Sequence, residues 1–280
     1  MSSPTNTPGP TAQDRFRQWA VAIGAVITIA GATMGAGAFE RTPIDQVADG
    51  ALAADATLLA PASTAFTIWS FIYAGLVLFA VYQALPSKGA DSRLRATSWW
   101  VLASMLLNAV WIGVIQTGLL WVSVVVIAIL AGVLGRLATT LASSPPSSWT
   151  ERFTTDVPVG LYLGWVVVAM IANVTAALSR ELQGFKPEDG TGFAVAALVF
   201  VAVLAVVIAH GLRQAPVLSI STGIALAWGL WWIAIGRLTD MPHDIATGWA
   251  AGIAAIVALS TPFAIRDYSY IGRHDPLAPE

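Results

Sequence analysis

Residues 192–212 have the sequence GFAVAALVFVAVLAVVIAHGL, which contains no Asp, Glu, Lys or Arg. A helix needs about 20 predominantly apolar residues to cross the hydrocarbon core of a bilayer. Inside a bilayer the backbone must satisfy its own hydrogen bonds, so an apolar stretch of this length predicts a transmembrane helix. No segments of about ten residues with alternating polarity are visible, which argues against a transmembrane β-barrel.

Further stretches of the chain share this apolar character, and most charged residues lie between them or at their ends. They cover residues 19–39, 62–85, 97–115, 118–142, 157–178, 216–236 and 245–265. The composition agrees, because 56% of the 280 residues are hydrophobic and only 11% are charged, against about 25% charged in a typical soluble domain. We therefore predict an all-α, polytopic membrane helix bundle with about eight transmembrane helices.

Several classes of chemistry are excluded by what the chain lacks. A formal net charge of −2 argues against a nucleic-acid partner. The absence of cysteine excludes disulfides and thiolate metal sites. Neither Lys88 nor Lys186 lies within an apolar stretch, so a retinal Schiff base is excluded. His210, His243 and His274 have no second ligand at a suitable spacing. We expect no catalytic residue, no metal site and no required cofactor, and hence no enzyme.

Lys and Arg are divided unevenly between the two sides of the predicted bundle. Of the 14 basic residues, four lie on one side (Arg41, Arg180, Lys186 and Arg237), and the rest lie on the other. Cytoplasmic loops usually carry the excess of Lys and Arg, so both termini are predicted to be cytoplasmic. We expect an integral protein of a bacterial inner membrane, surrounded by lipid. Residues 143–156, which contain Pro145 and Pro146, are expected to form a loop on the cytoplasmic side.

Two alternatives concern the first apolar stretch. Ala36-Gly37-Ala38 resembles a signal-peptide cleavage site, but the stretch exceeds the usual apolar region of about 7–15 residues, which favours a retained helix. Gly31 and Gly35 have the GxxxG spacing that lets helices approach closely. This spacing leaves a homodimer open.

Aromatic and amide residues gather on the second, third and fifth stretches. Trp69 and Tyr73 are four residues apart and share one helix face, and Asn108 and Trp111 are three apart on another. On the fifth stretch, Trp165, Ala169 and Asn173 form a stripe, with Tyr162 beside Trp165. Asn is costly against lipid, so both amides should face the bundle interior. Spacing alone favours helix packing over ligand binding, although apolar surfaces with a few polar groups are typical of small-molecule sites.

These segments resemble those of the tryptophan-rich sensory protein family, also known as the TspO/MBR or translocator protein family. The second stretch, from Pro61 to Tyr73, is similar to that family's second helix. Leu107-Asn108-Ala-Val-Trp111 resembles its third-helix motif, and the segment from Tyr162 to Asn173 resembles its fifth. The resemblance covers roughly residues 20–180. Leu161 departs from the pattern, because the family usually has Pro there.

The resemblance implies a five-helix core that binds porphyrins beneath the loop joining its first two helices. Residues 40–61 would form that loop. The implied ligand-binding residues are Trp69, Tyr73, Asn108, Trp111, Tyr162, Trp165, Ala169 and Asn173. The expected division is a disordered cytoplasmic tail (1–18), a five-helix core (19–180), three additional helices (181–266) and a second cytoplasmic tail (267–280).

The resemblance therefore predicts a membrane receptor for a planar hydrophobic ligand such as a tetrapyrrole, with a sensory or regulatory role. A bound porphyrin is the one cofactor-like molecule expected. Two alternatives stay open: a transporter of a hydrophobic small molecule, and a structural subunit whose additional helices bind a partner. Trp228, Trp231 and Trp232 on the seventh stretch are expected mainly to pack against neighbours.

Overall fold

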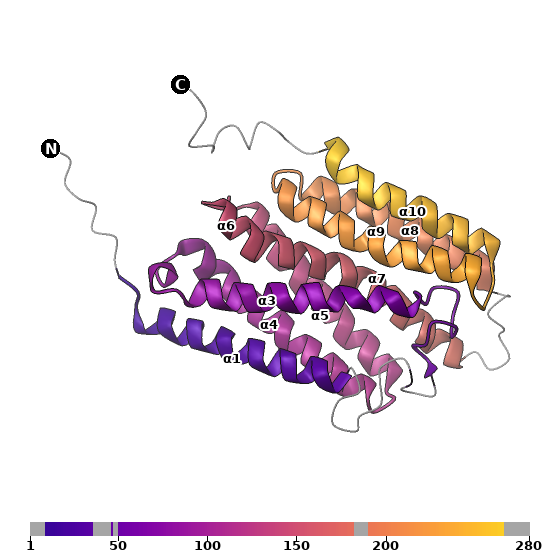
Figure 1. The fold of residues 1–280 in the computed structure, drawn as a ribbon, viewed down its shortest axis with the longest axis horizontal. Coiled ribbons are helices and arrows are strands. Elements are labelled where there is room, and N and C mark those ends of the chain that lie inside the picture. Colours follow the sequence, from indigo (N-terminus) through magenta and orange to yellow (C-terminus); the bar gives the residue numbers. More distant parts are fainter. Residues whose placement is uncertain (1–8, 36–45, 47–49, 182–189, 266–280) are drawn as a thin grey trace.

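The structure, a computed structural model, describes residues 9–35, 46, 50–181 and 190–265. Within these ranges the regular elements are all helical, and eight helical spans are long and apolar enough to cross a membrane (Figure 1). The all-α, polytopic prediction is confirmed. The elements are α1 (Ala12–Gly35), η2 (Ser63–Thr67), α3 (Ile68–Ala84), η3 (Pro86–Lys88), α4 (Ser92–Ile115), α5 (Leu120–Ala142), α6 (Trp149–Glu151), η4 (Arg152–Asp156), α7 (Val157–Glu181), α8 (Thr191–Gly211), α9 (Pro216–Thr239) and α10 (Ile245–Ile265).

The long helices lie side by side, and α7 lies between two groups of them (Figure 1). On one side α7 packs against α3 and α5, and α1 packs against α3 and α4. On the other side α7 packs against α9, and α10 packs against both α8 and α9. The contact between α7 and α9 therefore joins the first five spans to the last three.

That contact brings two backbones close together. A Cβ added at Gly160 of α7 would collide with the side chain of Ser221, and one added at Gly164 would collide with the carbonyl oxygen of Thr222. From the opposite helix, a Cβ at Gly229 would lie only 2.8 Å from a methyl group of Val168. Small residues permit such close approach, which strengthens van der Waals packing where no hydrophobic effect drives helices together.

The glycine pair noted for self-association has a different environment. A Cβ at Gly31 would lie 3.6 Å from the Cβ of Ala109 on α4 of the same chain. Gly31 is thus already in contact with a helix of its own bundle. The environment of Gly35 is not among the parts that the structure describes. The spacing that left a homodimer open is therefore accounted for in part by packing within one chain.

The first helix begins earlier than expected. We predicted a disordered tail over residues 1–18, but α1 starts at Ala12. The correction has a local cause: Thr11 Oγ1 accepts a hydrogen bond from the Asp14 amide at 3.2 Å, while an Asp14 carboxylate oxygen accepts one from the Thr11 amide at 2.9 Å. This reciprocal arrangement is a capping box, which satisfies amides that a helix start leaves unpaired. Residues 1–8 lie outside the described part.

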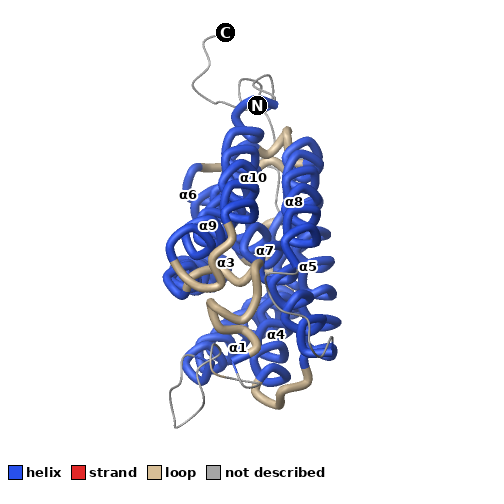
Figure 2. Tube along the Cα trace, turned by 90° about the vertical axis from the view of Figure 1, so that its right-hand side faces the viewer, coloured by secondary structure: helices blue, strands red, loops and turns tan. Residues whose placement is uncertain are grey.

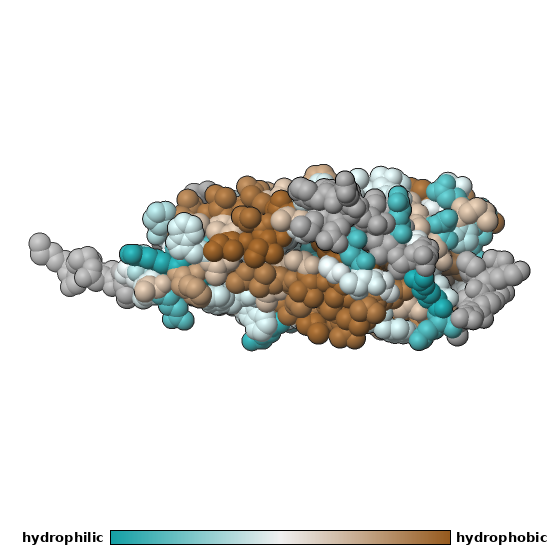
Figure 3. All heavy atoms as spheres, turned by 90° about the horizontal axis from the view of Figure 1, so that it is seen from below, coloured by the Kyte–Doolittle hydropathy of each residue, from teal (hydrophilic) through white to brown (hydrophobic). Residues whose placement is uncertain are grey.

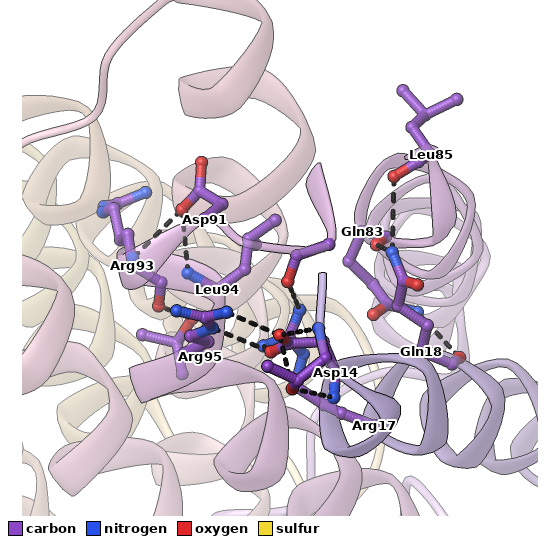
Figure 4. A network of polar contacts seen from close by, with 12 residues as sticks. Asp14, Arg17, Gln18, Gln83, Leu85, Asp91, Arg93, Leu94 and Arg95 are labelled. Carbon is purple, nitrogen blue, oxygen red and sulfur yellow. Dashed lines mark hydrogen bonds and ion pairs between the residues drawn. The ribbon is translucent and has the colours of Figure 1, made fainter. Parts of the chain in front are cut away.

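Asp14 also fastens α1 to α4 (Figure 4). Its carboxylate accepts hydrogen bonds from Arg95 Nε at 2.7 Å and from Arg17 Nη1 at 3.1 Å. Arg17 Nη2 donates in turn to the Gly89 carbonyl at 2.9 Å. Both Asp14 and Arg17 are buried. Because a buried charge without a partner is strongly destabilising, pairing these two charges with each other offsets the cost of removing them from water.

The fifth span also starts earlier than predicted. Residues 143–156 were expected to form a loop, yet a helix begins at Trp149 and continues through a π-helical turn, η4, into α7. Ser148 Oγ caps it by accepting from the Glu151 amide at 3.2 Å. Arg93 of α4 binds both Glu151, at 3.1 Å, and Asp156, at 2.5 Å. This buried cluster holds the start of α4 against α6 and η4, which lead into α7.

The opposite end of the bundle is fastened through Asp244. Its carboxylate accepts from Thr191 Oγ1 of α8 at 2.6 Å and from the Thr247 amide of α10 at 2.7 Å. Burial acts against ionisation, but these hydrogen bonds outweigh it and hold the pKa of Asp244 below its ordinary value. One carboxylate thus caps α10 and ties it to the start of α8.

The surface agrees with a membrane location. One face carries a broad apolar area across its middle, with hydrophilic residues mostly toward the two ends (Figure 3). Trp residues near the ends of the spans are exposed, among them Trp19 (71%) and Trp249 (65%). Together with the eight apolar spans, this pattern fits an integral membrane protein with a lipid-facing belt.

The α7–α9 contact generates a stability prediction. Replacing Gly164 with Leu forces a side chain into the backbone of α9 and should destabilise the protein by about 1–3 kcal/mol, the usual cost of overpacking. The measurement is the thermal unfolding midpoint in detergent. Gly132→Leu on α5 is the control, because a Cβ there meets nothing within 4 Å. Equal midpoints for the two variants would contradict the close contact.

Candidate functional site

Aromatic rings from α3 and α7 meet in the interior of the first five spans. Trp69 stacks on Tyr73, with ring centroids 5.0 Å apart and an interplanar angle of 14°. The edge contacts of Trp69 are with Tyr162, at 5.9 Å, and Trp165, at 6.2 Å. Phe66 of η2 adds a further edge contact to Trp165 at 5.6 Å. The aromatic residues predicted on these two helices therefore form one cluster.

Hydrogen bonds fix the polar members of this cluster. Asn108 Nδ2 donates to Tyr73 Oη at 3.1 Å, and Tyr162 Oη donates to the carbonyl of Ser104 at 3.1 Å. On the far side, Asn173 Oδ1 accepts from Ser123 Oγ at 2.8 Å. Both amides face the bundle interior and both are buried, as the cost of placing Asn against lipid predicts.

Two small adjoining cavities lie among these residues. The first, of about 20 Å³, is lined by Phe66, Trp69, Asn108, Trp111, Ile127, Leu130, Trp165, Val166 and Ala169. The second, of about 30 Å³, is lined by Ala51, Leu52, Thr57, Ala60, Pro61, Phe66, Trp111, Trp165, Ala169, Ala172 and Asn173. Each is large enough for a water molecule but far below the roughly 300–1,000 Å³ of a drug-sized ligand site.

Buried polar atoms around these cavities have no hydrogen-bond partner among the described residues. They are Asn108 Oδ1, Trp111 Nε1, Trp165 Nε1 and Asn173 Nδ2. A buried polar atom without a partner costs about 1–3 kcal/mol. Their concentration around one small space is thus a local energetic cost that a ligand with matching polar atoms would relieve.

The structure brings the predicted residues together but gives them different positions. Trp69, Asn108, Trp111, Trp165, Ala169 and Asn173 line the cavities. Tyr73 and Tyr162 instead pack against Trp69 and bind the neighbouring helices through their hydroxyl groups. A contact of any of the eight with a ligand stays a prediction. Phe66 and Ser123 were missed. Phe66 lies three residues before Trp69, a spacing that could have placed it on the same face, whereas Ser123 lies on the fourth stretch, where no candidate residue was noted.

One side of the cavity of about 30 Å³ is formed by the connecting segment that precedes η2. The described part of this connection, residues 50–61, contributes Ala51, Leu52, Thr57, Ala60 and Pro61. Figure 2 views the molecule from this end and shows the connecting segment over the centre of the bundle. We refer to residues 50–61 as the 50–61 segment.

Helix α9 holds the 50–61 segment in place. Arg237 donates to the Thr57 carbonyl from Nη1 and to the Ala54 carbonyl from Nη2, both at 2.8 Å. Immediately after the segment, the Ala62 amide donates to the Trp232 carbonyl at 3.2 Å, and Trp228 Nε1 donates to the Ala65 carbonyl at 2.9 Å. The helix beyond the expected five-helix core therefore helps to close the cavity.

Arg237 is the residue that sequence reasoning placed least well. We assigned it to the charges between the spans, yet its side chain is fully buried at the end of α9. Its position follows from the hydrogen bonds to main-chain oxygens, which replace those that water would provide. Nothing in the sequence around Arg237 identifies these partners, because they lie about 180 residues earlier in the chain.

The site has little capacity for metal or acid–base chemistry. No Asp, Glu, His, Lys or Arg is among the described residues that line the two cavities. In the described ranges of the chain there is also no group of three or more His, Asp or Glu residues that could hold a metal ion. What the arrangement offers is flat aromatic surface, two amides and two indole N–H groups, a set suited to binding a planar apolar molecule.

A comparison with protein families bears on this site. The sequence model of the family described as TSPO-like protein matches residues 18–263. The chain belongs to this family. No curated protein and no solved structure matches the chain. The matched range includes the three helices beyond residue 180, so the family relation extends further than the motifs on the second, third and fifth spans. Membership supports a general role in binding or transport at a membrane.

The contacts of Arg237 lead to a prediction about the 50–61 segment. Arg237→Gln removes the paired hydrogen bonds to Thr57 and Ala54, so the segment should leave its closed position more often. Leu59 is only 2% exposed, and the natural chain has no cysteine. The single thiol of a Leu59→Cys variant should therefore react several-fold faster with a hydrophilic maleimide in the Arg237→Gln background.

The control is Arg213→Gln. Arg213 is exposed, and its side chain donates a hydrogen bond to the carbonyl of His210, three residues earlier. The same labelling rate at position 59 in both backgrounds would show that Arg237 does not hold the segment.

Proposed function

We propose that the protein binds a planar hydrophobic ligand, a porphyrin such as protoporphyrin, among the aromatic residues of α3, α4 and α7, and that it serves a sensory or regulatory role. The observation that carries this proposal is the set of four unpartnered polar atoms around the two cavities, on Asn108, Trp111, Trp165 and Asn173. Polar substituents at the rim of a porphyrin can accept hydrogen bonds from the indole and amide N–H groups among these atoms, and the faces of its ring can stack against indole.

The size of the cavities sets a condition on this function. Spaces of about 20 and 30 Å³ cannot hold a tetrapyrrole, so the described conformation is a closed one under the proposal. Binding would require the 50–61 segment to withdraw and Trp69 to leave its stack on Tyr73. Movement of this segment on binding would also give a ligand-dependent change of shape, which is what a sensor needs.

The proposed setting is the bacterial inner membrane with both termini in the cytoplasm. The basic residues support this orientation, because most lie on the side of the termini. The ligand site would then lie toward the outer surface. A binding role is favoured over catalysis because the described lining residues of the cavities carry no titratable acid or base.

Transport of the ligand is the second candidate, because family membership supports it equally. At the end opposite the 50–61 segment, Arg93, Glu151 and Asp156 form a buried cluster, and breaking such a cluster is costly. This favours a binding protein over one that opens alternately to both sides. Porphyrin flux into proteoliposomes that hold the purified protein, compared with protein-free vesicles, distinguishes the two roles.

The binding proposal predicts the effect of a double variant. Trp165→Ala with Asn173→Ala removes one stacking surface and one amide, and should weaken protoporphyrin binding by about tenfold or more. Affinity is measured by titration of the porphyrin absorption band with detergent-purified protein. Metal-free protoporphyrin should bind at least as tightly as haem, because no described lining residue can ligate iron.

The matched control is Trp121→Ala. Trp121 lies near the start of α5 and is 43% exposed, so its loss should leave porphyrin affinity unchanged. Wild-type affinity in the double variant would count decisively against this site.

A further inference from the structure

A larger hollow lies beside the closed site, and none of the predicted ligand residues lines it. Its volume is about 380 Å³, within the range of small-molecule sites. The lining comes from three parts of the chain: the 50–61 segment, the end of α7 and the start of α8. The described lining residues are Ala56, Thr57, Leu58, Leu59, Thr175, Leu178, Ser179, Gly190, Phe193 and Ala194.

The lining of this hollow indicates which molecules it can accept. No described lining residue is charged, and the polar side chains are the hydroxyl groups of Thr57, Thr175 and Ser179. Phe193 is 54% exposed on α8, where other exposed residues such as Val199 and Phe200 are also apolar. A helix surface of this kind faces lipid. The hollow is therefore accessible to apolar molecules dissolved in the bilayer and unfavourable for ions.

Thr57 separates this hollow from the inner cavity. It lines the hollow of 380 Å³ and also the 30 Å³ cavity beside Trp165 and Asn173. Its hydroxyl lies 3.5 Å from the hydroxyl of Thr175, and its carbonyl accepts from Arg237 at 2.8 Å and from the Ala60 amide at 3.2 Å. The residue is 7% exposed. A small displacement of this one residue would join the two spaces.

We propose that the hollow is a portal site, where a planar apolar molecule from the lipid binds first, and that Thr57 is the gate between this site and the inner cavity. This proposal rests on the proposed function for the identity of the ligand. The route does not depend on which ligand uses it. The inner cavity is reached laterally, between α7 and α8, and Arg237 and Thr175 hold the gate closed.

The test uses a planar apolar thiol reagent, N-(1-pyrenyl)maleimide, on the full-length protein in membranes. The chain has no cysteine, and Ala169 lines both inner cavities, so Ala169→Cys provides one reactive thiol behind the gate. In the otherwise natural chain, this introduced thiol should react slowly. Thr57→Ala should raise the reaction rate several-fold, because it removes the contact with Thr175 and opens the partition.

A second variant tests the hollow itself. Ser179 is exposed and lines the hollow, so Ser179→Phe narrows it without displacing a buried side chain. This change should slow the labelling of the introduced thiol several-fold. Ser260→Phe is the matched control, because Ser260 is exposed on α10 and is not among the lining residues, and it should leave the rate unchanged.

The outcomes separate the portal from the ligand. If Ser179→Phe leaves the labelling rate of the introduced thiol equal to that of the Ser260→Phe control, or if Thr57→Ala does not raise it, the portal is overturned. Protection of the same thiol by protoporphyrin is a separate measurement. If both variants change the labelling rate as predicted but porphyrin does not slow labelling, the result supports the route and contradicts porphyrin as the ligand.

Discussion

The close contact between α7 and α9 is the interaction on which the remaining arrangement depends. Lipid is as apolar as a leucine side chain, so helices in a membrane gain little from hiding apolar surface and depend on close packing. Gly160 and Gly164 let the backbone of α9 approach α7 more closely than any larger residue would allow. Because α7 carries Trp165, Ala169 and Asn173, this contact brings α9 to the edge of the candidate site.

The position of α9 in turn determines the shape of the site. From there Arg237 reaches the 50–61 segment, and Trp228 reaches the turn at η2. With the segment held down, the aromatic cluster surrounds two small cavities, and four polar atoms beside them have no hydrogen-bond partner among the described residues. The same contacts that stabilise the closed segment therefore maintain an unsatisfied interior. Such opposition between a local cost and a global fold is expected at functional sites.

The sequence predicted the class of fold well, since transmembrane helices follow from the length of apolar stretches alone. It predicted helix faces on α3, α4 and α7 equally well, because spacing determines which residues share a face. Two helix starts were misplaced although their capping signals were present, in Thr11-Ala-Gln-Asp14 and Ser148-Trp-Thr-Glu151. The contacts of Arg237 and the volume of the cavities could not be predicted from the sequence. The contacts depend on the path of the 50–61 segment, and the volume depends also on the orientation of the Trp69 and Tyr73 rings.

The way in which Arg237 binds its partners affects how the sequence can diverge. The guanidinium holds carbonyl oxygens of Ala54 and Thr57, and every amino acid carries such an oxygen. Substitutions of the side chains at those two positions therefore leave the anchor intact, whereas an insertion or deletion in this stretch would shift the oxygens out of range. Among related chains, the number of residues between the first two spans should consequently vary less than the amino-acid types at those positions.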